Sequence, residues 1–274
     1  MKTRMGIVRW GLAAVMCLGA FVCMACNRVN NAGEQKTRKR VLTERRQVKY
    51  FKAIESSLAC DIYFTQRDGA PSVKIVGTRH DIDMVDCSVN ADGVLKIGSK
   101  GVRGILNGGF DGDMKIYLSS PDLVSIGAYG AGDLKVLSAL DTDTLRVCLN
   151  GTGDIDFERS VDCDEMYVTL KGSGDADFET VRAQKVDMQV YGVGDIDAKL
   201  VKVPMVNLLL KGTGDIEAEL DRCGAVSGSL YGVGNIELKG TAASFTSLER
   251  GTGRIDDSQL SVRKGGQTKR VTIN

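Results

Sequence analysis

Apolar residues recur at every second position through much of the chain between residues 124 and 238. Such alternation predicts β-strands that bury one face and expose the other. Each run leads into a pair of glycines, and the alternation resumes after them, so we expect each repeat to contain a strand, a glycine corner, a second strand and a shorter return segment. The positions predicted to be buried are Val124, Ile126, Ala128, Leu145, Val147, Leu149, Met166, Val168, Leu170, Val186, Met188, Val190, Val206, Leu208 and Leu210 before the corners, and Ile155, Phe157, Ile196, Ala198, Ile216, Ala218, Ile236 and Leu238 after them.

The glycine pair belongs to a motif, x-G-x-G-D-I, that recurs seven times with little variation. Its first glycines are Gly130, Gly151, Gly172, Gly192, Gly212, Gly232 and Gly251. This steady spacing predicts a solenoid in which each repeat forms one rung. The period is too short for a propeller blade and lacks the pattern of a leucine-rich repeat. The predicted fold class is therefore all-β: a right-handed parallel β-helix solenoid with rungs of about 20 residues and an N-terminal β cap region.

The glycines themselves are explained by the corner. A sharp bend between strands is expected to need a positive φ, which glycine adopts without a penalty from a Cβ atom. On this interpretation, alanine at Gly172 or Gly192 should destabilise the stack by more than ~1 kcal/mol.

The flanking segments complete the predicted domain organisation. Residues 121–257 form the repeat β-helix and residues 258–274 a C-terminal tail. Polar Ser247 and Glu249, with Arg254 in the aspartate column, make the last rung resemble a cap over exposed strand edges. Residues 48–120 form an N-terminal β region, as irregular rungs or as an antiparallel cap. Strands are expected around residues 58–65, 73–76, 85–89, 94–97 and 114–118, with a loop at residues 101–112.

The first residues are typical of an export signal. Lys2, Arg4 and Arg9 precede an uncharged run that ends at Ala25 and Cys26 and is short for a transmembrane helix. We interpret residues 1–25 as a lipoprotein signal peptide and Cys26 as the lipidation site, so that acyl chains would hold the protein on a membrane. There are two alternatives. Cys23 could be the lipidated residue, or ordinary cleavage could leave Cys26 as a free thiol. Residues 26–47 then comprise the lipidated cysteine and a basic, solvated tether.

Charge and cysteine content exclude several functions. The net charge of +1 comes from 36 basic and 35 acidic residues, so nucleic acid is not a predicted partner. Beyond Cys26 the cysteines are Cys60, Cys87, Cys148, Cys163 and Cys223. Their spacing matches no zinc motif, and His80, expected in a surface loop, is the only histidine. We interpret these cysteines as small buried side chains, with a Cys60–Cys87 bridge as the alternative for an oxidising periplasm.

Two columns of acidic residues are predicted to face outward. One contains Asp133, Asp154, Asp175, Asp195 and Asp215, and the other contains Asp156, Asp177, Asp197, Glu217 and Glu237. Like charges one rung apart repel, so something should compensate them. The first interpretation is that each aspartate of the first column caps its own corner through backbone N–H groups. The alternative is calcium at Asp154, Asp156, Asp175, Asp177, Asp195 and Asp197, because residues 150–158 nearly fit a calcium-binding nonapeptide. No other cofactor is predicted.

The position before each corner forms a third column. It reads Tyr129, Asn150, Lys171, Tyr191, Lys211, Tyr231 and Arg250. Stacking and cation–π contacts explain this alternation structurally. As a function, a row of exposed tyrosines and lysines could bind sugar rings or a protein partner. Tyr129, Lys171, Tyr191, Lys211 and Tyr231 are therefore the candidate ligand surface.

These features together resemble a known family. The lipobox, the pattern around residues 51–64, the segment from Tyr117 to Pro121 and the serial corners resemble the bacterial "putative auto-transporter adhesin, head GIN domain" family over residues 48–256. The resemblance implies an exported, β-helical, usually lipid-anchored protein with no assigned catalytic residues. We expect a lipoprotein of the bacterial outer membrane that faces either the periplasm or the surface.

Catalysis is the least favoured function. Rungs of this length leave no room for the insertions that build a cleft, and acyl transfer lacks a base because His80 is the only histidine. We therefore expect a non-enzymatic, lipid-anchored cell-envelope protein that acts as an adhesion or interaction module. A polysaccharide-processing enzyme and a purely structural envelope element are the alternatives.

Overall fold

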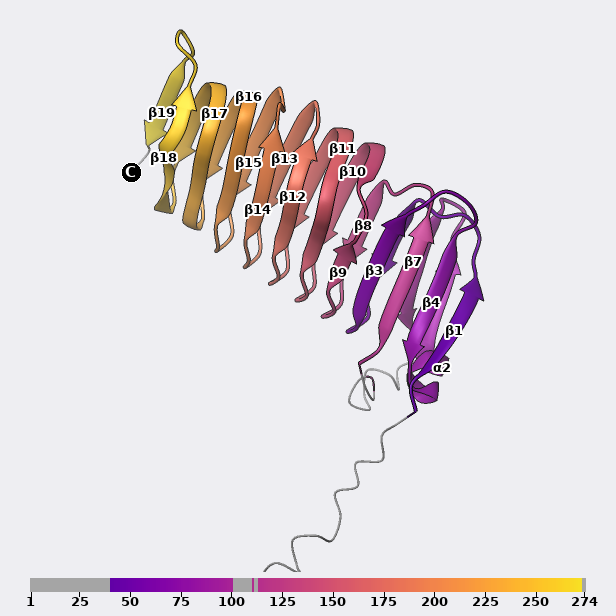
Figure 1. Ribbon diagram of the computed structural model, residues 1–274. Coiled ribbons are helices and arrows are strands. Elements are labelled where there is room, and N and C mark those ends of the chain that lie inside the picture. Colours follow the sequence, from indigo (N-terminus) through magenta and orange to yellow (C-terminus); the bar gives the residue numbers. More distant parts are fainter. Residues whose placement is uncertain (1–39, 101–109, 111–112, 273–274) are drawn as a thin grey trace, which may run out of the picture. The chain divides into compact units, whose positions relative to one another are not determined.

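The computed structural model describes residues 40–100, 110 and 113–272. Most of their strands form two parallel stacks that meet at the glycine corners (Figure 1). Strands that lead into the corners form the pre-corner sheet, and strands that leave them form the post-corner sheet. The predicted parallel β-solenoid is confirmed.

The strands of each sheet follow from the pairing pattern. The pre-corner sheet contains β2 (Ala53–Ser56), β6 (Val94–Ser99), β8 (Ser125–Ala128), β10 (Leu140–Leu149), β13 (Lys185–Val190), β15 (Met205–Leu210) and β19 (Thr268–Thr272). The post-corner sheet contains β3 (Asp61–Gln66), β7 (Lys115–Ser120), β9 (Leu134–Val136), β12 (Ala176–Arg182), β14 (Ile196–Val201) and β18 (Thr252–Val262). Strands β11 (Ile155–Leu170), β16 (Ile216–Leu230) and β17 (Val233–Glu249) run from the post-corner sheet through the return bend into the pre-corner sheet.

Equivalent apolar side chains stack on one another inside the solenoid. In the pre-corner sheet Val147 lies beside Val168, which lies beside Met188. The rings of Phe157 and Phe178 stack with centroids 4.8 Å apart. All the predicted core positions are buried except Val124, which is partly exposed while its neighbour Leu123 is buried. The alternation therefore identified the core correctly.

The corner glycines differ from the prediction in their conformation. None of the seven first glycines has a positive φ; in the later repeats that conformation belongs to the second glycine, for example Gly214 at φ 141°. The first glycine is required by close approach instead. A Cβ atom on Gly172 would lie 1.9 Å from the carbonyl oxygen of Gly151 in the preceding rung.

The N-terminal region combines both predicted arrangements. Strand β2 lies between β6 and β8, and β3 lies between β7 and β9, so the first rung in sequence is not the first rung of the stack. Three further strands pair antiparallel: β4 (Ser72–Gly77) with β7, β1 (Leu42–Gln47) with β4, and β5 (Val85–Val89) with β6. The five strands expected in this region are present, and the predicted loop at residues 101–112 lies largely outside the described residues.

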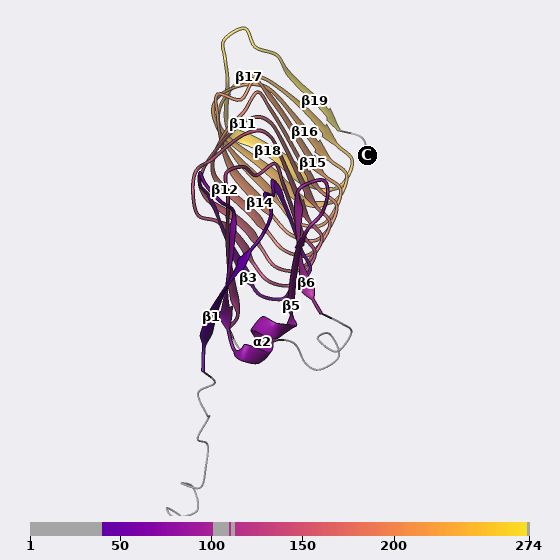
Figure 2. The ribbon, with the colours of Figure 1, turned by 90° about the vertical axis from the view of Figure 1, so that its right-hand side faces the viewer.

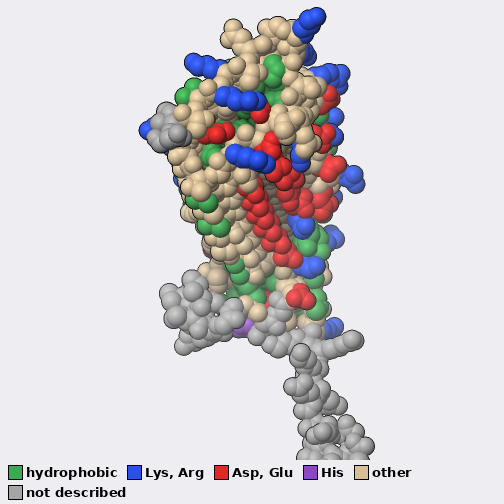
Figure 3. Space-filling view, turned by 90° about the vertical axis from the view of Figure 1, so that its left-hand side faces the viewer, with side chains coloured by type: hydrophobic (Ala, Val, Ile, Leu, Met, Phe, Trp, Pro, Cys, Tyr) green, Lys and Arg blue, Asp and Glu red, His purple; other side chains and the backbone are tan. Residues whose placement is uncertain are grey.

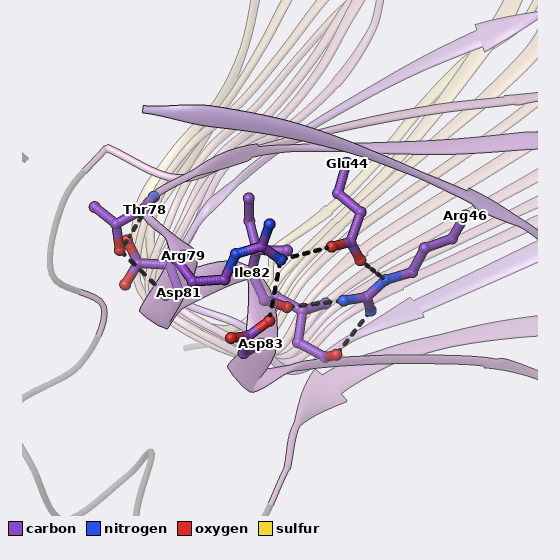
Figure 4. Close-up of polar contacts among 8 residues, drawn as sticks. Glu44, Arg46, Thr78, Arg79, Asp81, Ile82 and Asp83 are labelled. Atoms are coloured by element: carbon purple, nitrogen blue, oxygen red, sulfur yellow. Dashed lines mark hydrogen bonds and ion pairs between the residues drawn. The ribbon is translucent and has the colours of Figure 1, made fainter. Parts of the chain in front are cut away.

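A short helix closes this end of the stack. Helix α2 (Arg79–Met84) begins with a capping box between Thr78 and Asp81, and Figure 2 shows it between the β1 side and the β5 side. His80 therefore lies in a helix and not, as predicted, in a loop. Arg46 holds the helix to β1, since it donates hydrogen bonds of 2.8 Å to the carbonyls of Ile82 and Val85 (Figure 4). Residues 42–47 are thus a strand, which corrects the predicted tether at its C-terminal end.

The C-terminal residues extend the solenoid. Residues 258–262 continue β18, and β19 pairs in parallel with β17, so the predicted tail contributes strands to the stack. Ser247 is buried, and Glu249 accepts a hydrogen bond of 3.0 Å from the backbone N–H of Ile255. The polar residues of the predicted cap therefore lie within the stack, which continues beyond them.

The described cysteines are all free, including Cys60 and Cys87, which form no bridge. Burial raises the pKa of the Cys60 thiol to about 12. Within the described ranges, no helix has the length and apolar character needed to cross a membrane. Cys26, the predicted lipidation site, lies outside those ranges.

Candidate functional site

The strongest candidate is a shallow groove along the glycine corners. It has a volume of about 610 Å³. We define this corner groove by the side chains of Tyr191, Val193, Lys211, Thr213, Tyr231 and Val233. The motif places them there, since the residues before and between the two glycines of successive rungs stack at one edge of the solenoid. The groove is therefore a direct product of the repeat.

Its aromatic side chains are exposed although they are large. Tyr191 is 43% exposed and Tyr231 39%, and between them the Lys211 ammonium lies 5.6 Å from one ring centroid and 5.7 Å from the other. The hydroxyl of Tyr191 donates a hydrogen bond of 2.8 Å to the side chain of Gln189. Val193 and Val233 are more than half exposed. An exposed cluster of two tyrosines and two valines is typical of an interaction surface.

The remaining members of the predicted row differ from one another. The ring of Tyr129 lies against Gly127, and partial burial raises the pKa of its hydroxyl. Among the described residues, Lys171 makes no cation–π contact with a tyrosine. Only Tyr191, Lys211 and Tyr231 form the alternating cluster that the sequence predicted.

The first aspartate column is a ladder of backbone caps. The carboxylate of Asp154 accepts a 2.9 Å hydrogen bond from the N–H of Asp175, and that of Asp175 accepts one of 2.8 Å from Asp195. The same bond joins Asp133 to Asp154, Asp195 to Asp215 and Asp215 to Asn235. Each carboxylate therefore caps the corner of the next rung. The prediction that each aspartate caps its own corner was wrong. The ladder links consecutive rungs.

The second column forms an acidic surface on the post-corner sheet. Figure 3 shows acidic side chains gathered in a stripe along the stack. The pKa of Asp177 is raised mainly by desolvation and also by the neighbouring carboxylates of Asp197 and Asp156. The pKa of Asp197 is raised mainly by desolvation and also by Glu217. Lysines neutralise part of the surface. Lys135 pairs with Asp156 at 3.0 Å, Lys199 with Glu219 at 2.8 Å and Lys239 with Glu217 at 3.3 Å.

The described residues contain no preformed site for the calcium ions of the alternative interpretation. Within residues 40–100, 110 and 113–272, no group of three or more acidic, histidine or cysteine side chains is placed to hold a metal ion. In the first column, one carboxylate oxygen of each of Asp154, Asp175 and Asp195 already accepts a backbone N–H group. Calcium at Asp154, Asp156, Asp175, Asp177, Asp195 and Asp197 stays a prediction.

Two surface features were missed by the sequence analysis. On the pre-corner sheet, Tyr167 lies between Arg146 and Lys185, whose charged groups are 5.2 and 5.0 Å from its ring centroid. On the post-corner sheet, Tyr63 and Tyr117 stack with centroids 5.0 Å apart. Tyr167 occupies the same outward position in its pre-corner strand as Arg146 does in the strand before it. The alternation of the sequence could therefore have revealed this pair. The second stack joins segments with no repeat relation, so no sequence period could have revealed it.

The fold and this surface define a class: a β-solenoid whose repeated corners carry an exposed aromatic and cationic groove. Its family follows from comparison. Residues 50–242 match the family described as "Putative auto-transporter adhesin, head GIN domain", and the chain belongs to that family. The resemblance inferred from the sequence is confirmed. The chain is accordingly a member of an adhesin-like family of the cell envelope.

Solved structures share the fold. A putative adhesin from Bacteroides fragilis is 25% identical with a TM-score of 0.62, and the match covers 85% of this chain and 98% of that one. A putative adhesin from Parabacteroides merdae is 15% identical with a TM-score of 0.56, covering 85% and 97%. A putative lipid binding protein from Parabacteroides distasonis is 17% identical with a TM-score of 0.58, covering 85% and 98%. No curated protein matched the chain.

Proposed function

We propose that this chain is a non-enzymatic adhesion module of the cell envelope that binds a linear polysaccharide in the corner groove. Lipid attachment at Cys26 would hold it to the outer membrane, and the folded residues would present the groove. The single observation that carries the proposal is the exposed cluster of Tyr191, Lys211 and Tyr231. The family membership supports adhesion as the class of function.

The shape of the groove favours an extended ligand. Tyr191 and Tyr231 are two rungs apart, which corresponds to roughly 10 Å at the usual strand spacing. Tyrosine rings supply flat apolar area, while Lys211 and Thr213 supply hydrogen-bond donors, so that successive sugar units could meet alternating apolar and polar groups. Backbone hydrogen bonds of 2.9 Å, from Thr213 to Gly192 and from Val233 to Gly212, join successive corners under the groove. Such ordering before the ligand arrives lowers the entropy cost of binding.

The proposal predicts binding without turnover. The mature chain, with Cys26→Ser to keep it soluble, should be retarded in native gels that contain one or more members of a panel of neutral and acidic polysaccharides. No reducing ends should be released from any member during prolonged incubation. Released reducing ends would favour the alternative of a polysaccharide-processing enzyme, and binding to envelope proteins but to no polysaccharide would favour a protein partner.

A further inference from the structure

A second hollow lies on the outer surface of the post-corner sheet, at the N-terminal end of the stack. Its volume is about 330 Å³. We define this basic recess by the side chains of Arg45, Thr65, Arg67, Ser72, Lys74 and Ser119. They come from β1, β3, β4 and β7 and from the residue that follows β3, and strand pairing brings these segments side by side. The recess is separate from the corner groove, with which it shares no lining residue.

Its charges are unbalanced. Arg45 and Lys74 are directly opposite in the antiparallel pairing of β1 with β4, an arrangement that is destabilising for like charges. Among the described residues, no carboxylate forms an ion pair with Arg45, Arg67 or Lys74. Lys74 instead lies over the ring of Tyr117, 3.9 Å from its centroid.

Three other lysines of the same sheet have carboxylate partners. Further along the stack Lys135, Lys199 and Lys239 each have a carboxylate within 3.3 Å. Lys135 lies in the same outward row as Lys74, because the register runs from Lys74 through Tyr117 and Tyr63 to Lys135. Lys115 of β7 also has no ion pair among the described residues and lies 5.7 Å from the ring centroid of Tyr63. What distinguishes the recess is that three cations without an ion pair line one hollow.

Hydroxyl groups complete the recess. The hydroxyls of Ser72 and Ser119 lie 2.9 Å apart, and Arg67 donates a hydrogen bond of 3.2 Å to that of Ser119. Ser119 is 7% exposed. Two guanidinium groups, one ammonium and three hydroxyls thus surround a space with no lining carboxylate. Guanidinium groups bind tetrahedral oxyanions in a bidentate manner, and hydroxyls donate to the remaining oxygens.

We propose that the basic recess binds a sulfate or phosphate ester group carried by a saccharide. The recess is large enough for one substituted sugar unit. A bilayer fits less well, since membrane-binding surfaces insert apolar side chains and none of the large apolar side chains exposed in the described residues lines the recess. The proposal goes beyond the adhesion function, because it adds a second site with a different ligand chemistry.

Titration calorimetry with a sulfated disaccharide, a phosphorylated disaccharide and their unsubstituted parent tests the proposal. At least one ester should bind the mature Cys26→Ser chain tenfold or more tightly than the parent. The double variant Arg45→Gln/Arg67→Gln should lose that preference. The exposed pair Arg263→Gln/Lys264→Gln, which removes the same charge far from the recess, should retain it. Lys74→Gln, measured alongside, keeps the test valid if the double variant melts early.

Three results would overturn the proposal. They are equal binding of esters and parent, no binding of any ester, and an unchanged preference in both Arg45→Gln/Arg67→Gln and Lys74→Gln. Vesicles of phosphatidylglycerol form a further arm. Tight binding to these vesicles that Arg45→Gln/Arg67→Gln abolishes, without any preference for ester saccharides, would replace the saccharide with a lipid headgroup. A Tyr191→Ala/Tyr231→Ala variant should keep the preference, which separates this site from the corner groove.

Discussion

Gly172→Ala is expected to lower the free energy of unfolding by about 1–3 kcal/mol, the usual cost of overpacking. The added Cβ would lie 1.9 Å from the carbonyl oxygen of Gly151 and 2.8 Å from its amide nitrogen. Both atoms belong to the backbone of the preceding rung, so no side chain can move aside. Relief requires the two rungs to separate, which would weaken the hydrogen bond of 2.9 Å between the N–H of Ser173 and the same carbonyl. Guanidinium-induced unfolding followed by circular dichroism measures the loss.

Gly98→Ala is the matched control for this variant. Like Gly172, Gly98 lacks a positive φ, but it lies in strand β6 and its Cβ would meet nothing closer than the hydroxyl of Ser57 at 3.4 Å. Its unfolding midpoint should stay near that of the unsubstituted chain. If Gly172→Ala were as stable as Gly98→Ala, the close stacking of the corners would be wrong.

Asp175→Ala is expected to lower the free energy of unfolding by about 1–2 kcal/mol, as for a lost hydrogen bond to a charged group that is partly exposed. It removes the acceptor for the N–H of Asp195, which is bonded at 2.8 Å. Asp175→Asn should recover most of the loss, because an amide oxygen can accept the same bond.

The comparison of these two variants also distinguishes the two explanations of the acidic column. If the ladder is structural, the acceptor atom matters and the charge does not. An Asp175→Asn variant as unstable as Asp175→Ala would instead show that the negative charge is required. A loss that appeared only in the presence of calcium would support the metal alternative, and unfolding curves in excess calcium and in chelator would separate these outcomes.

Much of the fold could be predicted because every rung repeats the same pattern of buried strand positions and glycine corner. Val147, Val168 and Met188 occupy equivalent positions, so a period of two within a period of about 20 residues indicated both the strands and their stacking. The order of the N-terminal rungs could not be predicted, since a strand pattern such as that of β3 does not say which neighbours the strand pairs with. Strand β2 was not predicted, because its four residues are too few to show a period. Strand β1 was missed because Leu42 is its only apolar residue and Arg46 makes its main contacts with α2.

The candidate sites were predictable to different degrees. Tyr191, Lys211 and Tyr231 were identified because they occupy one position of a repeated motif. Their partners Val193 and Val233 were not, since residues inside a glycine corner are usually chosen for the turn. The basic recess had no signal in the sequence. Arg45 and Lys74 come from strands that only the antiparallel cap brings together.

The central claim is that the corner groove is the binding surface. The most direct test is the affinity of the Tyr191→Ala/Tyr231→Ala variant for one polysaccharide, namely the one that retards the mature chain most strongly in native gels. Tyr129→Ala is the control, because Tyr129 belongs to the same row and is 47% exposed but does not line the groove. We predict that the affinity of the double variant is lower by a factor of about ten or more, as expected when aromatic anchors are removed. The affinity of Tyr129→Ala should not change. Equal affinities for all three proteins would contradict the account.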